Sequence, residues 1–249
     1  MKENIALITG ASRGIGAATA KLLAQQNLHI IVHYHKNQEA ALTVVEHIIE
    51  HDGSAQAIQA DISQESDIIE LFNQIDKING KLTMLVNNAG ILFQQSTIAA
   101  LNAEQISKVL NTNVTGTLLC CKEAVKRMAI KYGGNGGAIV NVSSAASRLG
   151  APGEYIDYAA SKGAIDTITI GLSLEVAEQK IRVNGVRPGL IYTEINGDGG
   201  EPNRVDRLSH NIPMKRGGQP EEVAQAIVWL LSDKASYVTG SHIDLAGGK

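Results

Sequence analysis

Short runs of apolar residues alternate along the chain with longer stretches in which apolar residues recur at helical spacing. The run at residues 4–9, Asn-Ile-Ala-Leu-Ile-Thr, is typical of a strand buried on both faces. Further strands are expected at residues 28–34, 55–60, 82–86, 138–142, 181–186 and 242–245, and helices at about 38–51, 64–79, 103–132 and 220–231. Because parallel strands need helical crossovers, this alternation predicts an α/β fold, a doubly wound parallel sheet of about seven strands flanked by helices.

A single domain over residues 1–249 is expected, because no linker or internal repeat interrupts the alternation. The segment 190–219 departs from the regular pattern. It contains many glycines, prolines and polar residues, with a short helix expected near Val205. Long irregular segments of this kind are more often lids or binding loops than filler. We therefore expect this insertion to shape a substrate site.

Composition and charge exclude several classes of function. The formal net charge is -3 and no block of basic residues is longer than two, which argues against nucleic-acid and anionic membrane partners. The N-terminal apolar run is too short for a signal peptide, and no run approaches the ~18 apolar residues of a membrane span. Cys120 and Cys121 are adjacent, which does not suit a disulfide framework. These features predict a cytoplasmic protein.

The segment 9–16, Thr-Gly-Ala-Ser-Arg-Gly-Ile-Gly, lies between the first strand and a helical pattern that continues to Gln26. Strand, glycine turn and helix is the order found where a backbone approaches a diphosphate. Glycines permit the close approach, and the N-terminus of the helix offers free N–H groups and the positive end of its dipole. The spacing G-x-x-x-G-x-G differs from the commoner G-x-G-x-x-G, and the alternative is a tight turn without a ligand.

The end of the second strand, Tyr34-His35-Lys36, bears on the choice between NAD and NADP. An acidic residue here holds the ribose 2′-hydroxyl of NAD, whereas cationic groups suit the 2′-phosphate of NADP. The first acid, Glu39, comes too late, and Arg13 of the glycine-rich turn can reach the same place. We therefore expect NADP(H) to be preferred, with NAD(H) also accepted. The alternative is that His35 and Lys36 are only solvated loop residues.

Polar residues follow several of the expected strands. Gly10, Asp61 and Asn88 each stand at the end of a strand, and Ser143 and Ser144 follow the fifth. The carboxyl ends of parallel strands meet at one edge of the sheet, where ligands bind. Because neighbouring side chains on a strand point to opposite faces, only one of the two serines is expected to face the site.

Tyr158 and Lys162 are four residues apart in an expected helix, so the two side chains can share one face. A free tyrosine titrates near pH ~10, and a nearby ammonium group favours the phenolate and lowers that pKa. The pair is therefore a candidate for general acid–base catalysis near neutral pH. Tyr155, seven residues before Lys162, is a rival if the helix begins early. The tighter spacing favours Tyr158.

The histidines do not predict a metal site. His33 and His35 share a strand face, and His47 and His51 share a helix face. Neither pair has the nearby third ligand that a zinc site needs. All four are interpreted as structural or surface residues, and no metal is expected.

With these motifs in place, the chain resembles the short-chain dehydrogenase/reductase family over essentially its whole length, and so a single-domain Rossmann-type fold. The resemblance rests on the glycine motif 9–16, Asn87-Asn88-Ala89-Gly90, Tyr158 to Lys162, Pro188-Gly189 and Tyr237-Val238-Thr239-Gly240. Within the family, the chain is similar to the branch labelled 3-oxoacyl-[acyl-carrier-protein] reductase-like or glucose 1-dehydrogenase-like.

The resemblance implies catalytic roles for four residues. Tyr158 matches the proton donor or acceptor, and Lys162 matches the residue that lowers the tyrosine pKa and holds the nicotinamide ribose. Ser144 matches the serine that hydrogen-bonds the substrate oxygen, and Asn113 matches the asparagine that supports the lysine through a water. The loop between serine and tyrosine is one residue longer than in many members, which leaves the choice between Ser143 and Ser144 open.

Cofactor contacts follow from the resemblance and from the strand ends together. The expected contacts are Gly10, Ser12, Arg13, Gly14, Ile15, Gly16, Tyr34, His35, Lys36, Asp61, Ile62, Asn88, Ala89, Gly90, Tyr158, Lys162, Pro188, Gly189 and Thr193.

The leading expectation is an NADPH-dependent reductase that converts a ketone or aldehyde, such as a 3-oxoacyl thioester, to an alcohol with Tyr158 as general acid. One alternative is a sugar or polyol dehydrogenase that uses the same site in the oxidative direction. Another is a non-catalytic dinucleotide-binding sensor. The resemblance also implies a homotetramer. Arg204 and Arg207 could attract an acidic acyl carrier protein, although simple solvation is favoured.

Overall fold

The structure, a computed structural model, describes residues 3–249. One parallel sheet contains seven strands in the order β3-β2-β1-β4-β5-β6-β7. The strands are β1 (Glu3–Ile8), β2 (Leu28–Tyr34), β3 (Ser54–Gln59), β4 (Gly80–Asn87), β5 (Gly137–Val142), β6 (Ile181–Pro188) and β7 (His242–Leu245). The order reverses between β1 and β4, which leaves a crevice at the carboxyl ends of these strands. The predicted α/β fold class is confirmed.

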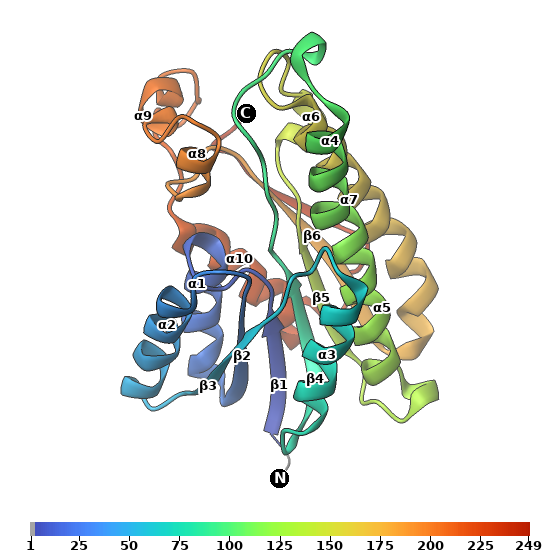
Figure 1. The fold of residues 1–249 in the computed structure, drawn as a ribbon. Helices are drawn as coiled ribbons and strands as arrows, with labels where there is room; N and C mark the ends of the chain where they lie inside the picture. The colour runs from blue at the N-terminus through green and yellow to red at the C-terminus, as the bar shows by residue number, and fades with distance from the viewer. Residues whose placement is uncertain (1–2) are drawn as a thin grey trace.

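Helices cover both faces of the sheet (Figure 1). One face carries α1 (Gly14–Leu23), α2 (Gln38–Glu50) and α10 (Pro220–Leu231), and the other carries α3 (Glu65–Asp76), α5 (Gly116–Met128) and α7 (Ile156–Val176). Helix α4 (Ala103–Leu110) precedes α5, and the short helices α6 (Ala146–Leu149), α8 (Ile195–Asp198) and α9 (Arg204–Ser209) lie near the carboxyl ends of the strands. Short 3-10 segments occur at Ala24–Gln26, Ile98–Ala100, Ile130–Tyr132, Ala177–Gln179 and Asp233–Ala235.

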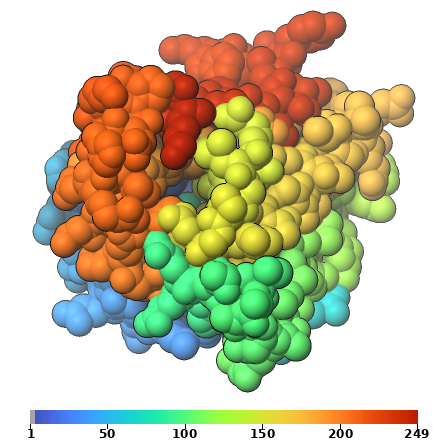
Figure 2. Space-filling model, turned by 90° about the horizontal axis from the view of Figure 1, so that it is seen from above, coloured from blue at the N-terminus to red at the C-terminus, as the bar shows by residue number. Residues whose placement is uncertain are grey.

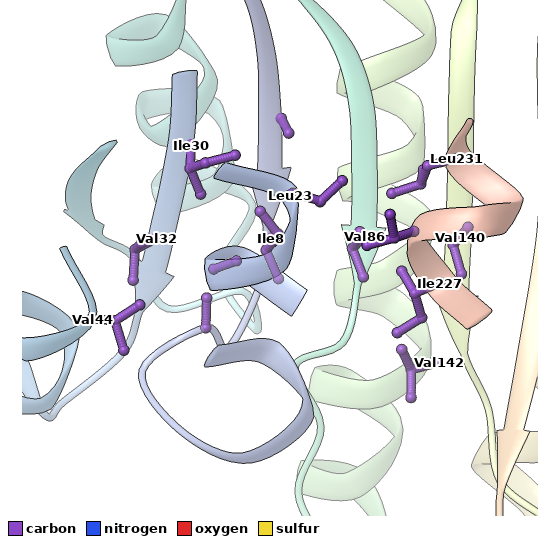
Figure 3. Close-up of a cluster of buried hydrophobic side chains, with 14 of the residues drawn as sticks. Ile8, Leu23, Ile30, Val32, Val44, Val86, Val140, Val142, Ile227 and Leu231 are labelled. Atoms are coloured by element: carbon purple, nitrogen blue, oxygen red, sulfur yellow. The ribbon is translucent and has the colours of Figure 1, made fainter. Parts of the chain in front are cut away.

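Two apolar clusters hold the helices against the sheet. Within β1, Ile8 belongs to the cluster under α1, α2 and α10, whereas Leu7 belongs to the cluster under α3 and α5. Figure 3 shows the first cluster, which joins Ile8 to Leu23 of α1, Val44 of α2 and Ile227 of α10. Burying one such side chain stabilises the fold by roughly 1.5–3 kcal/mol. Because both faces of the sheet are covered, its central strands are rich in buried apolar residues.

The expected bounds of all strands hold to within two residues. The expected single helix over residues 103–132 is wrong. A π-helical segment, η3 (Asn111–Thr115), separates α4 from α5, and α5 ends at Met128. The side chain of Asn113 accepts a hydrogen bond from Ile91 N at 2.8 Å and donates one to Ile91 O at 2.9 Å. A π-helical turn of this kind is frequent at functional sites.

The segment 190–219 contains α8 and α9 among turns, and the short helix expected near Val205 is confirmed by α9. Two of its short elements were not expected from the periodicity: α8, and a single bridge between Ile191 and Gly218. Helix α6 was also not expected from the sequence. Elements this short carry too few residues to show a helical period.

Among residues 3–249, none of the helices has both the length and the apolar character needed to cross a membrane. In the same part of the chain, no group of three or more His, Cys, Asp or Glu side chains could hold a metal ion.

Candidate active site

A cavity of about 940 Å³ opens at the carboxyl ends of the central strands. Figure 2 looks down on this end of the molecule, where a hollow lies between the orange segment after β6, the yellow segment after β5 and the green segment after β4. The structure brings most of the predicted site residues to its wall. They are Gly10, Ser12, Arg13, Gly14, Ile15, His35, Lys36, Asp61, Ile62, Asn88, Ala89, Gly90, Ser144, Tyr158, Lys162, Pro188, Gly189 and Thr193.

Three predicted site residues lie off the cavity wall. Tyr34 belongs to the apolar core, because side chains alternate along β2 and those of His33 and His35 face the cavity instead. Gly16 is buried within the first turn of α1. Asn113 is also buried and lies behind the wall. Of these, Tyr34 lies in the apolar core and not at the cavity wall where it was expected.

The turn after β1 has the features that a diphosphate requires. Helix α1 begins at Gly14, and its N-cap residue Arg13 makes no capping side-chain hydrogen bond. The first N–H groups of α1 are therefore free of a side-chain cap beside the cavity. Gly14 has φ +53°, and a Cβ there would lie 3.1 Å from Thr193 Cγ2 across the cavity. A glycine is thus needed where the turn and the loop after β6 come together, and the residues present fit a dinucleotide diphosphate.

His33 fixes the shape of this turn. Its Nδ1 accepts a hydrogen bond from Gly10 N at 3.0 Å, and its Nε2 lies 3.1 Å from Ala60 O. The proton is therefore on Nε2, which donates to the carbonyl. Burial lowers the pKa of His33 to about 4, so the ring is neutral at physiological pH. The sequence analysis interpreted His33 as a structural or surface residue, and the structure shows the structural role; the contact with the glycine-rich turn was not foreseen.

The residues expected at the NADP 2′-phosphate line the same cavity, and two of them, Arg13 and His35, lie beside carboxylates. Arg13 forms an ion pair with Asp198 of α8. His35 Nε2 lies 3.5 Å from Asp61 Oδ2. Lys36 is exposed at the rim. Both partner carboxylates would compete with a phosphate for these cations.

Asn88 joins β4 to the turn after β1. Its side-chain amide donates to Thr9 O at 2.9 Å and to Gly10 O at 3.0 Å. In return, Thr9 Oγ1 accepts the backbone N–H groups of Asn88 and Ala89, each at 3.0 Å. These bonds position the floor of the cavity between β1 and β4.

Tyr158 and Lys162 stand on consecutive turns of α7 and both line the cavity. Lys162 Nζ donates to Val142 O at 2.7 Å and lies 5.5 Å from the centroid of the Tyr158 ring. Burial lowers the pKa of Lys162 to about 8, while the charge of Asp166 opposes that shift. The end of β5 therefore anchors the lysine beside the tyrosine.

The expected lowering of the Tyr158 pKa is not met by the chain alone. Burial raises the pKa of Tyr158 to about 12, and a hydrogen bond with Ser144 acts in the opposite direction. The tyrosine is partly exposed on the cavity wall, but desolvation by the protein around its hydroxyl exceeds any influence of Lys162. The expectation was wrong because a helical spacing gives proximity without giving the degree of burial.

Asn113 connects the loop after β4 to α7. Besides its two bonds with Ile91, its side-chain amide donates to Ser161 Oγ at 3.0 Å. Ser161 Oγ in turn donates to Tyr158 O at 2.6 Å. The π-helical segment thus places one asparagine where it holds both a cavity loop and the turn that carries Tyr158.

The two serines after β5 differ in what they contact. Ser143 is buried, and its Oγ donates to Lys162 O at 3.1 Å. Ser144 is half-buried at the cavity wall, where its hydroxyl is hydrogen-bonded with Tyr158. Ser144 Oγ also accepts from Ala146 N at 3.1 Å. Ser144 is therefore the serine beside the tyrosine hydroxyl.

Tyr155, the rival tyrosine, faces elsewhere. Its hydroxyl donates to Gly199 O at 3.1 Å, and the guanidinium of Arg204 lies 5.2 Å from its ring centroid. Arg204 also forms ion pairs with Glu154 and Glu201. Tyr155 thus holds the segment 190–219 against the loop after β5.

Several residues of the wall were not expected from the sequence. The loop after β4 contributes apolar side chains, and α8 covers the same end of the cavity with one more. These residues are Ile91, Leu92, Phe93 and Ile195. No local motif marks them, because they come together only when the loops after β4 and β6 meet.

Comparisons with known proteins agree with this geometry. A family model described as "Enoyl-(Acyl carrier protein) reductase" matches residues 10–249. The chain is 67% identical over 245 residues to a protein of Escherichia coli (strain K12) named "Uncharacterized oxidoreductase YgfF", covering 98% of this chain and 99% of that protein. It is 36% identical to "Glucose 1-dehydrogenase 2" of Bacillus subtilis (strain 168), covering 98% and 93%. It is 37% identical to a "3-oxoacyl-[acyl-carrier-protein] reductase" of Synechocystis sp., covering 100% and 97%.

The match extends over the glycine-rich turn, the loop after β4, the Tyr158 helix and the segment that covers the cavity. These are the parts that border the cavity. The chain therefore belongs to the short-chain dehydrogenase/reductase family and is an NAD(P)-dependent oxidoreductase.

Proposed function

We propose that the protein reduces a ketone or aldehyde to an alcohol with NADPH as the hydride donor. The observation that carries this proposal is the single cavity in which Tyr158, Ser144 and Lys162 face the uncapped N-terminus of α1. When bound, the dinucleotide supplies the hydride. The protein supplies the binding site, the orientation of the carbonyl and the proton.

Each catalytic role follows from a contact in the site. The hydroxyls of Tyr158 and Ser144 polarise the substrate oxygen, and Tyr158 then donates its proton to the oxygen as it becomes an alkoxide. Lys162, held by Val142 O, stabilises the resulting phenolate by its charge. Asn113 positions Tyr158 through Ser161. A tyrosine whose pKa is raised stays protonated at neutral pH, which suits the reducing direction.

NADPH is proposed over NADH because three cationic or ionisable side chains gather where the 2′-phosphate would lie. Arg13, His35 and Lys36 line this part of the cavity. Asp198 and Asp61 are their present neighbours. A doubly charged phosphate attracts the guanidinium more strongly than one carboxylate does, so we expect the phosphate to displace Asp198 from Arg13. The preference is supported by charge alone and NADH remains a weaker donor.

The substrate is proposed to be compact and uncharged at its reacting end. Leu92, Phe93 and Ile195 add apolar wall to the cavity that Ser144 and Tyr158 also line. The arginines that suggested an acyl carrier protein are paired within the segment 190–219: Arg204 with Glu154 and Glu201, and Arg207 with Glu201. A simple ketone, or the short acyl part of a 3-oxoacyl thioester, needs no cation from these residues.

The test is a nicotinamide absorbance assay with NADPH or NADH and a panel of simple diketones, aldehydes and a short β-ketoacyl thioester. Tyr158→Phe should lower turnover by about 10²–10⁴-fold, the usual contribution of a general acid, while NADPH affinity stays within a few-fold. Tyr155→Phe is the matched control and retains most of the turnover. Near-normal turnover in Tyr158→Phe would overturn the proposal.

A second candidate is the oxidation of a sugar or polyol, which the relative named "Glucose 1-dehydrogenase 2" supports by similarity. The assay separates the two by offering NADP or NAD with glucose and related polyols at matched pH. Turnover confined to the polyols would favour oxidation. NADPH binding with no turnover on either panel would favour a non-catalytic sensor.

We also propose a homotetramer in the cytoplasm, with residues 1–249 acting as one domain and 190–219 as its lid. Large apolar side chains are exposed on the outer faces of α4, α5 and α7, which an assembly would cover. They are Leu110, Leu118, Ile170 and Leu174. Light scattering of the purified protein tests this: a monomer at micromolar concentration would contradict it.

A further inference from the structure

Asp166 lies one helical turn after Lys162 on α7, on the side of the helix that faces β6 and β7. Its Oδ2 accepts a hydrogen bond from Arg187 Nε at 3.0 Å. Its Oδ1 lies 3.3 Å from Nε2 of His242, the first residue of β7. Both of these last atoms are buried, and among the described residues neither has a well-oriented hydrogen bond with any other group. Asp166 therefore joins the catalytic helix to two strands of the sheet.

The charged groups around Asp166 come from every element packed against it. Arg187 of β6 also lies 3.7 Å from Asp244 of β7, and Asp244 lies 3.4 Å from Arg148 of α6. His242 of β7 contributes an imidazole, and its ring lies against Gly185, where a Cβ would be 2.4 Å from His242 Cδ2. Lys162 is the nearest ionisable group of α7 on the cavity side. Within this cluster, Asp166 is the carboxylate nearest Lys162 along the helix.

Asp166 also lies beside the serine segment. Burial opposes the shift, but the polar groups of His242, Ser143, Ser147 and Arg187 around the Asp166 carboxyl hold its pKa well below its usual range. Ser147 Oγ donates to Ser144 O at 2.8 Å. The carboxylate is thus a permanent negative charge behind the segment that presents Ser144.

This charge acts on the proton-transfer groups. Burial lowers the pKa of Lys162 to about 8, and the charge of Asp166 opposes part of that shift. A negative charge at the same place also disfavours the Tyr158 phenolate. Arg187 partly neutralises the Asp166 carboxylate. Asp166 and Arg187 therefore have opposite effects on the protonation of Lys162 and of Tyr158.

We propose that Asp166, paired with Arg187 and His242, is a positioning residue for the proposed reaction: it fixes the serine segment against α7 and sets the pH range in which Lys162 and Tyr158 keep their protons. The proposal rests on the proposed function of Tyr158 and Lys162. The ion cluster of Asp166, Arg187 and His242 lies outside the cavity, and none of its residues is part of the cavity wall.

The experiment compares Asp166→Asn and Arg187→Gln with wild type. The first readout is the alkaline limb of kcat/KM for NADPH-dependent reduction of a simple diketone. The second needs no activity: the phenolate absorbance of Tyr158 in the NADP complex, obtained by subtracting the same variant with Tyr158→Phe. Asp244→Asn is the matched control, because it removes an exposed carboxylate from the same cluster that contacts neither Ser143 nor Ser147 in the described contacts.

Asp166→Asn removes a negative charge, so the midpoint of the alkaline limb and the midpoint of the Tyr158 phenolate titration should both move to lower pH, by about 0.5–1 unit. Arg187→Gln removes a positive charge and should move both midpoints to higher pH. A unit charge in a partly buried site has effects of this size. Asp244→Asn should shift them by less than half as much. A purely structural role would lower the midpoint of thermal unfolding without moving either titration.

Unchanged midpoints in folded Asp166→Asn, or shifts of the same sign in both variants, would overturn the proposal. If Asp166→Asn does not fold, the direction of the Arg187→Gln shift decides. Normal turnover in Tyr158→Phe would instead overturn the proposed function, so the two failures are distinguishable.

Discussion

The turn after β1 and the segment 190–219 border the same cavity but are held by different kinds of contact. The turn is held by buried bonds to neighbouring strands, from His33 to Gly10 N and from Asn88 to Thr9 O and Gly10 O. The segment 190–219 is held in part by side-chain ion pairs, of which Arg204 with Glu154 is partly buried and Arg13 with Asp198 is exposed.

This difference has a physical consequence. Buried hydrogen bonds are costly to break, because each lost partner leaves an unsatisfied polar group away from water. Exposed ion pairs contribute little to the free energy of folding, and salt screens them further. The cofactor side of the cavity should therefore keep its shape, while the substrate side opens and closes at a small cost.

The largest expected effect is at Gly16. A Cβ there would lie 2.4 Å from Gly10 O and 2.6 Å from Asn88 Nδ2. Gly16→Ala should therefore cost about 1–3 kcal/mol of stability by overpacking, and NADPH affinity should fall by at least ten-fold as the turn moves. Denaturant unfolding and a fluorescence titration measure both. The control is Gly197→Ala on the lid, where a Cβ meets nothing within 4 Å; equal losses in the two variants would contradict the comparison.

The next effect concerns pH. His33 has a folded-state pKa lowered to about 4 by burial, below the value of 6.5 expected when unfolded. Between these two values the unfolded chain binds a proton at His33 and the folded chain does not. The contribution of His33 to the free energy of unfolding is therefore fully present above pH ~6.5 and is lost as the pH falls toward ~4, by about 3 kcal/mol in all. His33→Asn should remove this dependence.

Denaturant midpoints measured at several pH values between 4 and 7 test the His33 prediction. The exposed His210→Asn is the control and should retain the wild-type slope. If wild type and His33→Asn lose stability in parallel as the pH falls, another group is responsible and the turn is held differently.

The smallest effects are expected on the lid. Arg204→Met removes a partly buried guanidinium from two carboxylates, so local stability should fall by about 1–3 kcal/mol. Hydrogen exchange should then accelerate by roughly ten-fold or more over residues 195–209 and stay unchanged in the turn after β1. Asp198→Asn breaks only the exposed pair with Arg13, so the free energy of local opening measured by hydrogen exchange should change by less than about 1 kcal/mol. Acceleration that spreads to the turn would mean that the two regions open together.

The parts that sequence analysis placed correctly are those with a strong local signal. β2 and α10 have the predicted bounds, because a short apolar run marks the strand and apolar residues at helical spacing mark the helix. The glycine turn, Asn88 and the pair of Tyr158 and Lys162 were found because a recurrent spacing marks them. In contrast, Tyr34 was assigned to the site by proximity in sequence, and its pleat position sends it to the core.

The remaining misses depend on contacts between distant segments. The π-helical turn at Asn113 exists because its side chain bonds to Ile91, 22 residues away. The role of His33 depends on Gly10, 23 residues away. The pKa of Tyr158 depends on burial that no spacing reports. Each is a tertiary effect on a residue whose neighbours in sequence give no sign of it.

The sequence by itself determined the order of strands and helices, the edge of the sheet where the cavity opens and the placement of Tyr158 and Lys162 on one helix, because periodicity and motif spacing are local properties of a chain. Only the tertiary structure decided which serine lies beside Tyr158, which tyrosine contacts the segment 190–219, and which charges surround Lys162. Those outcomes depend on burial and on the electrostatic field of groups brought together from α6, α7, β6 and β7, and these exist only once the sheet has formed.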